Sequence, residues 1–100
     1  MNIFTFDQIY NLVHAKAHSN STNGVMDWYD FYKDPEEIEE LIEKLPKNNT
    51  FKKDIQTAAT VLQKDFEILS QDSYDDINEI RNKHLEIQDK LPNFLYKYIQ

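Results

Sequence analysis

Apolar residues recur every three or four positions along most of this chain, which is the spacing of one buried face of an α-helix. Thr5 and Gln8 form a capping box, in which each residue hydrogen-bonds the backbone of the other at a helix start. The apolar positions that follow are Phe6, Ile9, Tyr10, Val13 and Ala17. This pattern predicts a first helix over about residues 6–18, ended by the polar run "SNSTNG".

Asp34-Pro35 predicts the start of a second helix, because an aspartate caps well and proline suits the first helical position. Its expected buried stripe is Ile38, Leu41, Ile42 and Leu45. Pro46 marks the exit, and the following "PKNNT" is expected to be a loop. Residues 25–33 fit either a short helix or an extended arm.

The pattern predicts two further long helices and a short terminal one. The third helix, at about residues 51–71, should be central because it is apolar over a wide arc: Ile55, Ala58, Ala59, Val61, Leu62, Phe66, Ile68 and Leu69. The fourth should be capped by Asp72 or Ser73 and carry an apolar line close to a heptad seam: Ile77, Ile80, His84, Ile87 and Leu91. After Pro92, "NFLYKYIQ" is typical of a short terminal helix.

One glycine and three prolines in 100 residues argue against an all-β protein, which needs many tight turns. The short expected loops favour antiparallel neighbours. We therefore predict an all-α fold: a single acidic helical domain over residues 1–100, built as a small antiparallel bundle of four to five helices, with no sheet of three or more strands.

Charge and composition exclude several classes of function. The net charge is −7, and ten lysines accompany one arginine, so we expect no direct nucleic-acid binding. No apolar run is long enough to span a membrane, and we expect no signal peptide. Without cysteines there are no disulfides, which favours a reducing, cytoplasmic setting. Lysine in place of arginine, with many Asn, Ile, Tyr and Phe, is typical of an AT-rich genome such as that of a low-GC bacterium or its phage.

Residues 27–45, "DWYDFYKDPEEIEELIEKL", combine eight acidic residues with large aromatic side chains. Glu36 with Glu40, and Glu39 with Glu43, are four apart on the expected second helix, and each such like-charge pair costs about 0.2–0.5 kcal/mol. Local helix stability therefore does not explain the cluster. The candidate partner-binding residues of this segment are Asp27, Trp28, Tyr29, Asp30, Tyr32, Glu36, Glu39, Glu40 and Glu43.

Two interpretations of this segment stay open. It is either a solvated face, partly neutralised by Lys47, Lys52 and Lys53, or a docking surface on which acids steer a basic protein and aromatic residues anchor it. The second interpretation predicts a protein that binds and inhibits a basic partner. That partner would be a nuclease or other nucleic-acid enzyme, with the acids as a nucleic-acid mimic in a phage anti-defence role, or a toxin held by its immunity protein. The alternative function is a structural or regulatory helical module.

The histidines add two weaker candidates. His14 and His18 are four apart and would share a helix face, as a metal pair must, but a site needs a third ligand such as His84 or Asp7. We therefore predict no metal and no cofactor. His84 interrupts an apolar line, so it is either a partly buried histidine with a partner or the polar position of a homodimer seam along residues 77–91. No nucleophile or phosphate-binding motif is present, and we predict that the protein is not an enzyme.

Overall fold

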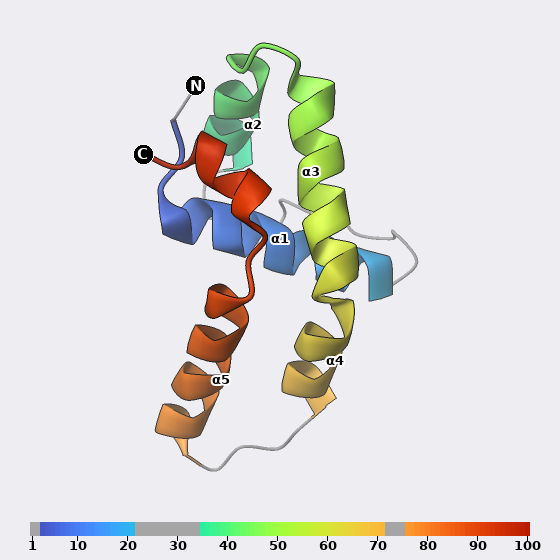
Figure 1. Ribbon diagram of the computed structural model, residues 1–100, viewed down its shortest axis with the longest axis vertical. Helices are drawn as coiled ribbons and strands as arrows, with labels where there is room; N and C mark the ends of the chain where they lie inside the picture. The colour runs from blue at the N-terminus through green and yellow to red at the C-terminus, as the bar shows by residue number, and fades with distance from the viewer. Residues whose placement is uncertain (1–2, 22–34, 72–75) are drawn as a thin grey trace.

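The computed structural model describes residues 3–21, 35–71 and 76–100, and these form an all-α bundle, as predicted (Figure 1). The elements are α1 (Phe6–Ser21), α2 (Pro35–Glu43), α3 (Asn48–Val61), α4 (Gln63–Gln71), α5 (Ile77–Asp89) and the 3-10 helix η1 (Asn93–Tyr98). In Figure 1, α1 crosses the middle of the molecule, with α2, α3 and η1 on one side of it and α4 and α5 on the other. The only β-type pairing within these ranges is an isolated bridge between Phe4 and Ile99.

The core lies around α3, which packs against α1, α2, α4 and η1. Leu62 and Phe66, expected to be deeply buried, are 1% and 5% exposed. The stripe predicted for α2 is also confirmed, with Ile38, Ile42 and Leu45 buried and Leu41 packed against the same cluster. The central place of the third predicted helix follows from its apolar arc, as the sequence indicated.

The capping box at the start of α1 forms as predicted. The Thr5 backbone N–H donates to Gln8 Oε1 at 2.9 Å, and the Gln8 N–H donates to Thr5 Oγ1 at 3.1 Å. Both bonds satisfy donors that a helix start leaves without intrahelical partners. The helix continues to Ser21, three residues beyond the predicted end.

The prediction of one long third helix over residues 51–71 is wrong in two respects. The observed helix starts earlier, and it is broken at Leu62. Lys47 adopts a left-handed conformation (φ 59°, ψ 51°), so the chain turns sharply and α3 already begins at Asn48. At the other end, the hydroxyls of Thr57 and Thr60 donate to the carbonyls four residues earlier, a contact that bends helices. The helix ends at Val61, and α4 begins two residues later, at Gln63.

Two apolar residues of this region do not lie where the sequence predicted. Val61 and Ile68 were expected on the buried face, yet they are 62% and 46% exposed. Val61 precedes the buried Leu62 by one position, which places it about 100° around the helix from the core. The predicted arc was therefore too wide on this flank.

Helix α5 begins later than predicted and is only partly buried. Its N-cap is Asp76, whose carboxylate accepts from the Asn78 N–H at 2.9 Å, and not Asp72 or Ser73. Ile87 and Leu91 are buried in the core, whereas Ile77 is 71% exposed. The predicted apolar line is thus divided between the chain's own core and solvent.

The two ends of the described chain lie together (Figure 1). The Phe4 N–H donates to the Tyr98 carbonyl, and the Gln100 N–H donates to the Phe4 carbonyl. Tyr98 packs edge-on against Phe51 and donates its hydroxyl to Asp54 at 2.6 Å. These contacts attach η1 to α3. None of the helices in the described ranges is long and apolar enough to cross a membrane.

Candidate functional site

The acidic side of α2 is the part of the predicted binding segment that the structure describes. Glu36, Glu39, Glu40 and Glu43 are all exposed. Ile38 and Ile42, on the opposite side of the same helix, are buried in the core. Because burial of the apolar side fixes how the helix is rotated, the four glutamates are held facing solvent.

No basic side chain of the described ranges neutralises these glutamates. The ion pairs there join Lys83 to Glu86, Lys90 to Asp65 and Lys97 to Asp54, all away from α2. Lys47, Lys52 and Lys53, which were expected to fold back over the acids if the segment is only a solvated face, make no ion pair with them. Among the described residues, the glutamates of α2 therefore face solvent without a paired cation.

The aromatic part of the segment lies outside the described residues. This covers the candidates Asp27, Trp28, Tyr29, Asp30 and Tyr32, the predicted cap Asp34, and the ambiguous stretch 25–33. Their roles stay predictions, and the four glutamates are the part of the candidate site that the structure describes.

A second cluster joins α1, α4 and α5 through aromatic rings. The Tyr10 hydroxyl lies 2.6 Å from His84 Nδ1, so the partly buried His84 has a hydrogen-bonding partner, as one interpretation of the sequence predicted. His14, one turn after Tyr10, stacks on Phe66 with ring centroids 4.5 Å apart and planes 7° apart. The His14 and His84 rings are 5.8 Å apart.

Burial sets the ionisation of this cluster. It lowers the pKa of His14 from 6.5 to about 4, and repulsion from His84 and His18 acts in the same direction. Burial also lowers the pKa of His84 and raises that of Tyr10 to about 12. The neutral forms of all three side chains therefore fit this interface at neutral pH.

The histidines do not form a metal centre within the described part of the chain, where no three His, Asp or Glu side chains are grouped to hold an ion. His14 is packed against Phe66, while His18 is exposed on the same helix. The stacking with Phe66 gives His14 a packing role that the spacing of the two histidines did not indicate.

Sequence reasoning missed the ring cluster and also a basic hollow between α1 and α3. Tyr10 and His14 are four apart on α1, so their shared face was a readable signal. The hollow is lined by Lys16, Lys52, Lys53 and Gln56. Because Lys16 is distant in sequence from the other three residues, no local sequence pattern predicts that they lie close together.

No protein-family model, curated protein or solved structure matches this chain.

Proposed function

We propose that this protein is an acidic interaction protein that binds and inhibits a basic protein partner, with α2 supplying charge to the docking surface. The observation that carries the proposal is the arrangement of Glu36, Glu39, Glu40 and Glu43. They repel one another on one exposed helix side, and no described cation pairs with them. Such an arrangement does not stabilise the free protein, but it attracts a positively charged surface over several ångströms.

The acids and the aromatic residues have different roles in this proposal. Exposed charges at an interface chiefly accelerate encounter, whereas buried Trp and Tyr side chains slow dissociation. We therefore assign steering to the glutamates, together with Asp27 and Asp30, and anchoring to Trp28, Tyr29 and Tyr32. Truncation of Trp28 to alanine should cost about 2 kcal/mol or more of binding, mainly through faster dissociation.

The partner class follows from the charge. A nuclease or other nucleic-acid enzyme has a basic groove that the acids would occupy in place of phosphates, and a basic toxin presents a similar surface to its immunity protein. Both partners place the encounter in the cytoplasm, as in a phage anti-defence or immunity system. The proposal is one of binding without catalysis.

Affinity capture with matched baits tests the proposal. The wild type, the variant E36Q/E39Q/E40Q/E43Q and the control D7N/E79Q/E86Q/D89N are immobilised, and proteins retained from lysates of low-GC bacteria are identified. Both variants lose four negative charges, but the control loses them away from α2. A basic nuclease, nucleic-acid enzyme or toxin should be retained by the wild type and the control and lost by the α2 variant. Equal loss on both variants would contradict the assignment to α2.

A structural or regulatory module that dimerises through residues 77–91 is the second candidate. Ile77 and Leu85 are 71% and 50% exposed on α5, and a second copy would cover them. Ile87 and Leu91 already belong to the chain's own core, so such a seam would use only part of the predicted line. Sedimentation velocity at micromolar concentrations decides this: a dimer that Leu85→Glu dissociates supports it, and a monomer excludes it.

A further inference from the structure

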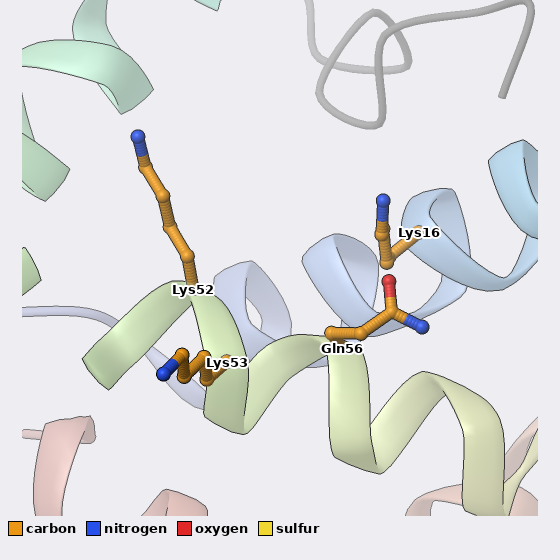
Figure 2. A pocket seen from close by; sticks show the side chains of 4 residues that line it. All are labelled: Lys16, Lys52, Lys53 and Gln56. Atoms are coloured by element: carbon orange, nitrogen blue, oxygen red, sulfur yellow. The ribbon is translucent and has the colours of Figure 1, made fainter. Parts of the chain in front are cut away.

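The basic hollow between α1 and α3 is lined by positively charged side chains, although the protein as a whole is strongly acidic. Lys16 of α1 and Lys52 and Lys53 of α3 line it together with Gln56 (Figure 2). The chain has a net charge of −7 and only ten lysines, so three of them around one hollow form a local exception to its overall charge.

These lysines lack internal counterions within the part of the chain described here. The lysines of the described ranges that pair with carboxylates are Lys83 on α5, Lys90 directly after α5, and Lys97 on η1. No described acidic side chain lines the hollow. The three lysines line one hollow, although Figure 2 shows Lys53 extending in a different direction from Lys16 and Lys52. Their positive charges repel one another, and an anion bound at the hollow would lower that repulsion.

The walls of the hollow are firmly held. α1 and α3 pack directly on each other through fully buried side chains, including Val13, Ile55 and Ala59. Gln56 donates its side-chain amide to Thr60 Oγ1 at 3.0 Å, which fixes its orientation. Lys16 is half-buried, so its stem is packed while its ammonium group reaches the opening. In Figure 2, Lys16 and Lys52 extend to the same side of the two helices.

We propose that this hollow binds a small phosphate-bearing anion of the size of a diphosphate group. Its volume of about 280 Å³ lies near the lower end of small-molecule sites. Lysine binds phosphate as a mobile point charge with three donors, and three lysines match an anion that carries two or more charges. Free diphosphate and a nucleoside diphosphate share this chemistry.

The rest of the surface limits the ligand to small anions. A long nucleic acid bound at the hollow would extend over neighbouring surface of a protein with seven excess negative charges, which opposes it. The site is therefore compatible with the expectation that the chain does not bind DNA or RNA.

An NMR titration of the whole chain with inorganic pyrophosphate, at constant ionic strength, tests the proposal. We expect saturable shifts centred on the amides of Lys16, Lys52, Lys53 and Gln56, with a Kd below about 1 mM. A parallel titration with ADP separates the two sources of the group: tighter binding would show that the base is also recognised, and equal binding would show that the diphosphate alone is. A short DNA duplex should give no saturable shifts.

Two double variants make the test specific. K52Q/K53Q should weaken pyrophosphate binding roughly tenfold, whereas K44Q/K64Q, which removes two exposed lysines elsewhere, should weaken it less than about twofold. All four lysines are exposed, so both variants should fold, and a melting curve checks this. Lys16→Gln provides a third, single-site variant. Shifts that do not saturate by about 10 mM, or equal weakening in both double variants, would overturn the proposal.

Discussion

At the scale of single residues, Phe66 of α4 and His14 of α1 pack against each other where the two helices meet. Phe66 is 5% exposed and belongs to the core, and the His14 ring stacks flat on it. A large aromatic side chain in this position contributes both buried area and ring contacts. Two predictions follow from this pair.

The first prediction concerns the core. Phe66→Ala should lower the free energy of unfolding by about 3–5 kcal/mol, because it removes buried area and leaves a cavity. Chemical denaturation measures the loss. Val61→Ala, on the exposed flank of the same helical run, serves as the control and should change stability by less than about 0.5 kcal/mol. A loss below about 1 kcal/mol for Phe66→Ala would show that this part of the molecule is peripheral.

The second prediction concerns pH. The pKa of His14 is lowered to about 4 in the folded protein, whereas the unfolded chain takes up the same proton near 6.5. The folded state is therefore favoured above pH 6.5, and stability declines as the pH falls from 6.5 towards 4. Each pH unit between these values lowers the free energy of unfolding by at most about 1.4 kcal/mol. The actual loss is smaller, because the ring keeps some contact with solvent.

His14→Phe provides the test of this pH dependence. It retains a flat ring against Phe66 and removes the titrating group. Denaturant melts at several pH values between 4 and 7 should show a shallower decline for this variant than for the wild type. Equal slopes in His14→Phe and the wild type would mean that other groups control the acid response.

At the scale of elements, α2 is held by one side and charged on the other. Its buried stripe attaches it to the core, while its glutamates make unfavourable pairs at three and four positions apart. Of Glu36, Glu39, Glu40 and Glu43, only Glu36 lies in the first turn, where the positive end of the helix dipole stabilises a negative charge. The net electrostatic effect of the four on the free helix is near zero or unfavourable.

A third prediction follows for α2. The variant E36Q/E39Q/E40Q/E43Q should be as stable as the wild type or slightly more stable, within about 1 kcal/mol. Denaturant melts of the free protein at low and high salt provide the measurement. Any gain should shrink at high salt, since screening already weakens the repulsion in the wild type. A loss above about 2 kcal/mol would show that these glutamates have structural partners.

The element scale also shows where sequence reasoning succeeds. The capping box of Thr5 and Gln8 and the stripe of α2 depend on residues within two turns of each other, and both were predicted. The break at Leu62 was not predicted. The hydroxyls of Thr57 and Thr60 donate to backbone carbonyls in the turns just before it, a contact that often bends helices. Threonine does this in some helices and faces solvent in others, so its presence alone does not predict a bend.

At the scale of the whole molecule, the fold class was predictable and the meeting of distant residues was not. A single glycine and a helical period along most of the chain indicated an all-α bundle. The ring cluster of Phe4, Phe51 and Tyr98 joins residues far apart in sequence, and so do the lysines that line the hollow. Helix periodicity indicates which side of each helix is buried, but it does not indicate which helices become neighbours.

The distribution of charge over the whole molecule gives a fourth prediction. With a net charge of −7 and one arginine, the protein should not bind duplex or single-stranded DNA or RNA at physiological salt. Fluorescence anisotropy with labelled random-sequence oligonucleotides measures this. Binding with micromolar affinity would contradict both the charge argument and the proposed partner class.

The association rate of the protein with its captured basic partner, followed by stopped flow from low to high salt, tests the central claim most directly. We predict a fast wild-type association rate that falls steeply with salt, since acids steer the encounter. We predict a slower rate with a flatter salt dependence for E36Q/E39Q/E40Q/E43Q, and near wild-type behaviour for D7N/E79Q/E86Q/D89N. Identical rates and identical salt slopes for all three proteins would mean that the acids of α2 form only a solvated face.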